Sequence, residues 1–144
     1  GPRQAPSFVA PSFARQLALI ECGHVEPIIK TGNLNARRDI TDVRDVVRAY
    51  HLLMEQGRPG VLYNVCSGVA YAISDVLNEL RQNISCQVQI NVDQALLRKN
   101  DTDLQLGDPS RIKSETGWNS TISFKQMLKD LLDYWRQTVK NQET

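Results

Sequence analysis

The part of the sequence that most restricts the fold runs from Gly32 to Gly68. Apolar residues in its first half recur at the spacing of one face of an α-helix. They are Val43, Val46, Val47, Tyr50, Leu53 and Met54. Thr41 or Asp42 is placed to cap this helix, and Gly57 suits its C-terminal end. The stretch therefore predicts an amphipathic helix with one apolar face.

Features on either side of this helix predict an anion site and a strand. Arg37 and Arg38 follow a glycine turn at Gly32, so we expect them in a constrained turn that leads into the helix. Such a turn is suited to holding an anion, because arginine forks bind phosphate oxygens in pairs. After the helix, the apolar run Val61–Cys66 has the length and composition of a short β-strand.

The rest of the chain alternates shorter helical and strand patterns. Strands are expected at Ile28–Thr31 and Cys86–Val92, and the polar residues 93–107 are typical of a surface segment. Further helices are expected to begin at or near Pro11, Ile73, Asp108 and Ser123. The last of them has a capping box formed by Ser123 and Gln126. This alternation favours an α/β protein whose strands are few and short.

The bulk composition excludes several classes of function. The 144 residues are 41% hydrophobic and 23% charged, as in one soluble globular domain. A net charge of +1 gives no electrostatic signature of nucleic-acid binding, and no apolar run approaches the roughly 20 residues of a membrane span. Three widely spaced cysteines fit a reduced cytosolic chain, and no Cys/His spacing is typical of zinc. We expect a cytoplasmic protein with no nucleic-acid partner, membrane partner or metal.

Several short motifs of the central stretch stand together in one order along the chain. They are Gly32-Asn33-Leu34, Arg37-Arg38-Asp39, the run Asp42–Tyr50 and Tyr63-Asn64-Val65-Cys66-Ser67-Gly68. In this order they resemble the C-terminal half of extended short-chain dehydrogenase/reductases that act on nucleotide sugars, the NAD-dependent epimerase/dehydratase family. Within it the chain is most similar to the GDP-mannose branch, namely GDP-mannose 4,6-dehydratase and GDP-6-deoxy-4-keto-mannose reductase. The resemblance covers nearly the whole chain.

The resemblance implies a fold and a domain arrangement. Residues 1–144 would be the C-terminal, substrate-binding part of a Rossmann-fold enzyme, an α/β unit of helices with few short strands. A strand and helix near residues 61–82 would return to the Rossmann sheet. The N-terminal cofactor domain is expected to be absent from this chain.

The same resemblance implies that the chemistry depends on that other half. These enzymes bind NAD or NADP on a glycine-rich turn and transfer a proton through a Tyr-x-x-x-Lys pair. Neither motif occurs here, since the residues four positions after the tyrosines are Met54, Ser67, Asp75 and Thr138. We therefore expect no catalytic residue in this segment, a cofactor bound mainly by the N-terminal half, and a possible homodimer.

Candidate substrate-binding residues follow from the same match. Arg38 corresponds to the arginine that the family uses on the pyrophosphate, and Arg98 corresponds to a second one. Asp101 stands where the family places an acidic residue on the ribose hydroxyls. The positions whose backbone would frame the nucleotide base are Asn33, Leu34 and Val9. Other charged groups have structural expectations: Arg37 would face solvent or pair with an acid, and Asp39, Asp42 and Asp45 would be caps or ion-pair partners.

The sequence leads to one preferred function and three alternatives. The preferred one is the GDP-sugar-binding part of an NAD(P)H-dependent GDP-6-deoxy-4-keto-mannose reductase, which would form GDP-rhamnose. Pro11 and Ser12 stand where dehydratases of this branch carry basic residues, which favours the reductase. The alternatives within the superfamily are a GDP-mannose 4,6-dehydratase and an epimerase or dehydratase of another nucleotide sugar. The alternative of a different class is a non-catalytic module that binds a nucleotide sugar.

Overall fold

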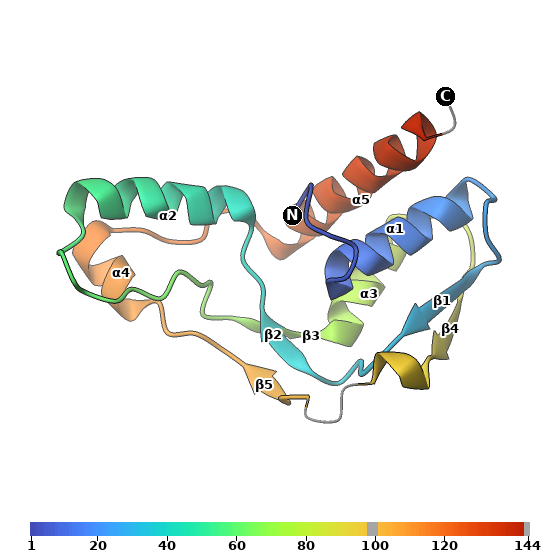
Figure 1. Cartoon of the computed structure of the whole chain (residues 1–144), viewed down its shortest axis with the longest axis horizontal. Coiled ribbons are helices and arrows are strands. Elements are labelled where there is room, and N and C mark those ends of the chain that lie inside the picture. The colour runs from blue at the N-terminus through green and yellow to red at the C-terminus, as the bar shows by residue number, and fades with distance from the viewer. Residues whose placement is uncertain (98–100, 143–144) are drawn as a thin grey trace.

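Two hydrophobic clusters, joined by a small three-stranded sheet, organise the computed structural model of the chain (Figure 1). The structure describes residues 1–97 and 101–142. Its elements in chain order are α1 (Val9–Glu21), β1 (Ile28–Thr31), β2 (Arg37–Asp39), α2 (Val43–Gln56), β3 (Ala70–Ala72), α3 (Ile73–Arg81), β4 (Gln89–Val92), the short 3-10 helix η1 (Gln94–Leu96), β5 (Leu104–Gln105), α4 (Ser110–Thr116) and α5 (Phe124–Asn141).

The larger cluster lies between α1, α3 and α5. Leu17 of α1, Leu77 and Leu80 of α3, and Leu128 of α5 are all buried in it. The helices expected to begin near Ile73 and Ser123 are confirmed, and the apolar residues that recur along α3 and α5 are buried in this cluster. α1 begins at Val9, two residues before the expected Pro11, because the first turn of a helix tolerates a proline that has no N–H to donate.

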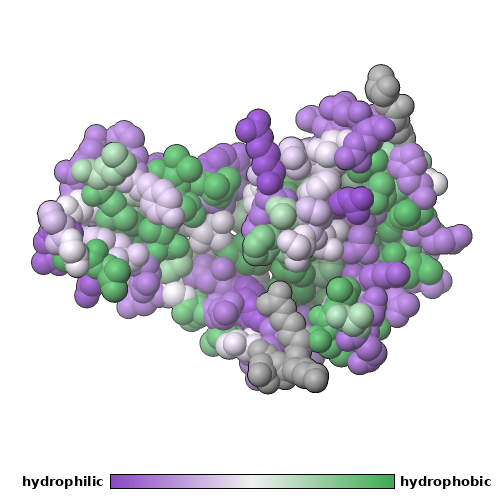
Figure 2. Space-filling model, in the orientation of Figure 1, coloured by the Kyte–Doolittle hydropathy of each residue, from purple (hydrophilic) through white to green (hydrophobic). Residues whose placement is uncertain are grey.

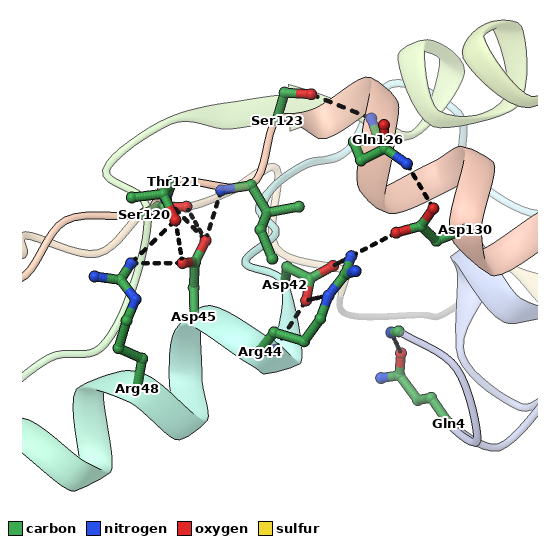
Figure 3. A network of polar contacts seen from close by, with 12 residues as sticks. Gln4, Asp42, Arg44, Asp45, Arg48, Ser120, Thr121, Ser123, Gln126 and Asp130 are labelled. Carbon is green, nitrogen blue, oxygen red and sulfur yellow. Dashed lines mark hydrogen bonds and ion pairs between the residues drawn. The ribbon is translucent and has the colours of Figure 1, made fainter.

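The start of α5 confirms half of the expected capping box (Figure 3). The Ser123 hydroxyl accepts the N–H of Gln126 at 3.2 Å. The amide of Gln126 does not return to Ser123, and donates instead to the Asp130 carboxylate at 2.6 Å. The helix therefore begins where the sequence predicts, with a cap made by one side chain.

The smaller cluster joins α2 to α4 and the chain around it. Ala49, Ile112 and Trp118 are buried there, with Leu53 and Tyr63 packed at its edge. The prediction of the amphipathic helix is confirmed. Part of its apolar face, however, is exposed and not buried in a core. Its exposed apolar residues form a stripe, which we call the α2 stripe: Val43, Val47, Tyr50 and Met54. Val47 is 61% exposed and Met54 is 88% exposed.

Two further predictions about this region are wrong. The arginines do not lie in a turn, because Arg37–Asp39 is strand β2, paired on both sides. The run Val61–Cys66 forms no strand, and Leu62 within it is 87% exposed. β2 pairs with β3 and β5, and strands this short are set by their neighbours more than by their own composition.

The strands form two small sheets. In the first, β1 and β4 are parallel, with Ile29 opposite Ile90. In the second, β2 lies in the middle, antiparallel to β3 and parallel to β5. The strand predicted at Cys86–Val92 is confirmed from Gln89 onward, but its half-buried character is wrong because Ile90 and Val92 are exposed.

Surface hydrophobic residues therefore gather at particular places on the molecule. Figure 2 shows them at the end formed by α2 and α4 and again near β1 and β4. Within the described residues, no helix is long and apolar enough to cross a bilayer.

Candidate functional site

Arg38 stands on the middle strand of the three-stranded sheet, with its guanidinium group held by three hydrogen bonds. β2 places Arg38 beside Tyr71 of β3 and Gln105 of β5. Its Nη1 donates to the carbonyl of Thr102 at 2.6 Å and to the carbonyl of Arg37 at 2.9 Å. Its Nη2 donates to Asp101 Oδ1 at 2.6 Å, in an ion pair whose side chains are 20% and 19% exposed. The group is partly buried and its direction is fixed.

Asp101 connects Arg38 to a second residue of the expected site, Asn33. The Asn33 Nδ2 donates to Asp101 Oδ2 at 3.2 Å. The Asn33 Oδ1 in turn accepts the N–H of Asn35 at 3.0 Å, which fixes the orientation of the amide. Three of the residues that the sequence singled out, Asn33, Arg38 and Asp101, thus form one hydrogen-bonded group, although 68 positions separate Asn33 from Asp101.

This arrangement leaves Arg38 with spare donors. An arginine has five N–H groups, and Arg38 uses two on Nη1 and one on Nη2. The Nε–H and the second Nη2–H have no partner among residues 1–97 and 101–142. Two donors on a fixed guanidinium are what a bidentate contact with phosphate or carboxylate requires. The group is chemically suited to an anion.

The other expected site residues have no hydrogen bond to this group among the described residues, or lie outside the described chain. Val9 and Leu34 pack at the edge of the larger cluster. The Leu34 carbonyl accepts the N–H of Ser74 at the start of α3 at 2.9 Å. No hydrogen bond links either residue to Arg38 within the part of the chain that the structure describes. Arg98 lies outside the described residues.

The neighbouring charges have structural partners. Arg37 is exposed, and its Nη2 donates to the carbonyl of Ala70 at 3.0 Å. The Asp39 carboxylate accepts the N–H groups of Ser67 and Gly68 at 2.9 and 2.8 Å, and so fixes the turn before β3. Asp42 caps α2 by accepting the N–H of Arg44. The expectation of a cap or ion-pair partner is confirmed for Asp42 and for Asp45, which pairs with Arg48. Among the described residues Asp39 is neither of these, and its carboxylate binds a turn instead.

Asp45 has a larger role than its sequence position indicates (Figure 3). Its carboxylate is 1% exposed and accepts five hydrogen bonds from Arg48 and from residues 120–122. Burial raises the pKa of this carboxyl, but the donors outweigh burial, so the pKa lies below its usual range. Only its place in the first turn of α2 was visible in the sequence, because the loop it binds is more than 70 positions away.

The described residues contain no cluster of three or more His, Cys, Asp or Glu side chains placed to hold a metal ion.

Comparison with known proteins identifies the class of fold first. The structure of RMD from Pseudomonas aeruginosa complexed with NADPH superposes with a TM-score of 0.90 at 33% identity, over 96% of this chain and 46% of that one. A UDP-glucose 4-epimerase from Thermotoga maritima with UDP-glucose superposes with a TM-score of 0.78 at 26% identity, over 96% of this chain and 43% of that one. The α/β class and the likeness to part of a Rossmann-type extended short-chain dehydrogenase/reductase are confirmed.

The family follows from the sequence match. The family described as GDP-mannose 4,6 dehydratase matches residues 1–131, and the chain belongs to it. The GDP-6-deoxy-D-mannose reductase of Pseudomonas aeruginosa is 34% identical over 99% of this chain and 47% of its own length. The GDP-mannose 4,6 dehydratase of Dictyostelium discoideum is 27% identical over 97% of this chain and 44% of its own length. The chain thus spans about half the length of the curated relatives it matches.

Proposed function

We propose that this chain is the GDP-sugar-binding part of an NAD(P)-dependent oxidoreductase. The observation that carries the proposal is the Arg38 guanidinium, fixed by Asp101 and two carbonyls, with two donors that have no partner among the described residues. A nucleoside diphosphate sugar presents pyrophosphate oxygens that match such a fork. Membership of the GDP-mannose 4,6 dehydratase family supports the assignment of the ligand. Arg98, Asn33, Leu34 and Val9 belong to the proposed site by resemblance.

Within that class we propose the reductase of GDP-6-deoxy-4-keto-mannose. The support is the greater identity to a GDP-6-deoxy-D-mannose reductase, 34%, than to a GDP-mannose 4,6 dehydratase, 27%. NADH or NADPH, bound mainly by the other half of the protein, would supply hydride to the C4 ketone. The role of this chain is to hold the GDP so that the ketone is positioned, because binding energy far from the reacting atoms can lower the barrier.

The test is turnover by the whole encoded protein. With GDP-4-keto-6-deoxymannose and reduced cofactor, we expect loss of the reduced-nicotinamide absorbance and formation of GDP-rhamnose. The matched reaction uses GDP-mannose, from which a 4-keto product would identify a dehydratase. GDP binding without turnover of either sugar would identify a non-catalytic binding module. Absence of GDP binding would overturn the proposal as a whole.

The α2 stripe is a surface against which the rest of a longer protein could pack. Val43, Val47, Tyr50 and Met54 lie along one side of α2 and are exposed, and Leu62 is exposed as well. A row of large apolar side chains on a helix is unusual for a surface that faces water. Since the relatives are about twice as long, we propose that the rest of a family-length protein, the expected Rossmann half, covers the stripe. The return of residues 61–82 to a Rossmann sheet, a homodimer and a cytoplasmic location stay predictions.

Changing Val47 to glutamate in the whole encoded protein tests this contact. A charge buried at an apolar interface without a partner is costly, so we expect the Tm to fall by several degrees, corresponding to about 2 kcal/mol or more. The measurement is thermal unfolding of the wild type and the variant.

The control is Glu55→Gln, which changes charge on the same helix at a side chain that is 58% exposed. This change is expected to leave the Tm within about 0.5 kcal/mol of the wild type, as for most surface substitutions. Equal Tm values for Val47→Glu and Glu55→Gln would show that the stripe faces water in the whole protein.

A further inference from the structure

We propose that Asp101 is a positioning residue for Arg38, and that with Asn33 it aims the two spare donors of Arg38 at the anion. The inference rests on the proposed GDP-sugar site. Within that site, Arg38 would bind the anion and Asp101 would position Arg38. Resemblance to the family implies a contact between Asp101 and the ribose. The contacts of the Asp101 carboxylate indicate instead that its main role is to hold the Arg38 side chain in place.

Both carboxylate oxygens of Asp101 are already bonded to the protein. Oδ1 accepts from Arg38 Nη2 at 2.6 Å and Oδ2 accepts from Asn33 Nδ2 at 3.2 Å. The side chain is 19% exposed, so these bonds are partly shielded from water. The Asn33 amide cannot turn freely, because its Oδ1 is bonded to the N–H of Asn35. The loop 33–35 thus fixes the Asn33 amide, which holds Asp101, and Asp101 in turn holds the Arg38 guanidinium.

The local backbone adds a second restraint from the same segment. The carbonyl of Thr102, next to Asp101, accepts from Arg38 Nη1 at 2.6 Å. Nη1 and Nη2 are thus both bonded to residues 101–102, while β5 runs parallel to β2 a few residues later. An arginine fixed in this way has already lost side-chain freedom before the ligand arrives, so less entropy is lost on binding.

A carboxylate beside a phosphate site also has a cost. Its negative charge repels the pyrophosphate, and removing the charge would by itself tighten anion binding. Positioning and repulsion therefore predict opposite results when Asp101 is replaced. A contact with ribose predicts a third result, an effect confined to ligands that carry the hydroxyls. These three possibilities can be separated by the choice of ligand.

The experiment measures dissociation constants of the whole encoded protein for three probes. They are inorganic pyrophosphate, GDP, and the GDP analogue that lacks both ribose hydroxyls. For Asp101→Ala we expect all three to bind more weakly by the same factor, about three- to tenfold. Asn33→Ala should weaken all three in the same direction by a smaller factor, because it removes the donor to Asp101 Oδ2 but leaves the bond between Asp101 and Arg38.

A double-mutant cycle tests whether Asp101 affects binding through Arg38. In an Arg38→Ala background, Asp101→Ala should weaken binding no further, because the residue that it positions is gone. A merely structural role for Asp101 would lower affinity by the same factor in both backgrounds.

Three outcomes would overturn the inference. Unchanged or tighter pyrophosphate binding by Asp101→Ala would show that repulsion dominates. A loss seen with GDP but not with pyrophosphate or the analogue would make Asp101 a ribose ligand. Equal losses with and without Arg38 would make it a structural residue. If the unmodified protein binds none of the probes, the proposed function itself fails and the inference falls with it.

Discussion

Replacing Asp45 with asparagine is expected to lower the free energy of unfolding by about 3 kcal/mol or more, because a buried carboxylate with several donors is lost. Asp45 Oδ2 accepts from the Ser120 hydroxyl and from the backbone N–H groups of Thr121 and Ile122 at 2.9 to 3.0 Å. Oδ1 accepts from Arg48 at 2.6 Å and from the Thr121 hydroxyl at 2.9 Å. An asparagine would turn an N–H₂ group toward some of these donors and leave them unpaired.

The same carboxylate joins the two clusters of the fold. It stands on α2, while the loop 120–122 that it binds leads directly into α5 of the larger cluster. The indole N–H of Trp118 adds a bond to the backbone carbonyl of Asp45 at 2.9 Å. Asp45 is thus one point at which α2 is fixed to the segment that connects α4 with α5 (Figure 3).

Urea unfolding of the whole encoded protein measures the effect, with Asp130→Asn as the control. Asp130 also pairs with an arginine, Arg44, but its side chain is 26% exposed. A half-exposed pair of this kind contributes about 1 kcal/mol or less. Equal unfolding midpoints for the two variants would contradict the role given to Asp45.

The pH dependence has a definite sign. The pKa of Asp45 is lower in the folded protein, so its stabilisation is complete above the unfolded-state pKa of about 3.9. It declines as the pH falls below that value and through the folded-state pKa. The stability difference between wild type and Asp45→Asn should therefore be constant near neutral pH and shrink in acid.

The helices of this fold were largely predictable from local sequence. A 3.6-residue period indicates which residues of α3 and α5 are buried, and Ser123 marks the start of α5 by its capping hydroxyl. The exposure of the α2 stripe could not be predicted in the same way. A period identifies an apolar face, but the neighbour that covers the face is a property of the tertiary structure, and within the described residues the stripe is exposed.

Short strands and the site depend on contacts between distant residues. β2 and β5 are three and two residues long, and their existence rests on pairing between segments far apart in the chain. The bond between Arg38 and Asp101 spans 63 positions, and no local spacing encodes it. Resemblance to a family could select both residues as ligands of a nucleotide sugar. Only coordinates could show that they bond to each other.

Arg38→Ala is expected to weaken GDP binding by the whole encoded protein about 10- to 100-fold, because charge-assisted hydrogen bonds contribute about 1.5–3 kcal/mol. Turnover should fall as well, since a GDP held less firmly no longer fixes the sugar against the cofactor. Arg38→Lys keeps the charge but not the fork, and should lie between the wild type and Arg38→Ala. Isothermal titration with GDP and initial rates with the keto sugar measure the two effects.

Arg37→Ala is the matched control, because it removes the same charge from the neighbouring residue of β2. Arg37 is exposed and its side chain donates to the carbonyl of Ala70, away from Asp101. We therefore expect its loss to change GDP affinity by only about twofold, as for an exposed charge screened by salt. Equal losses for Arg37→Ala and Arg38→Ala would mean that net charge, not a directed fork, attracts the ligand. A similar Tm for both variants would show that any difference in affinity arises at the site and not from loosening of the sheet.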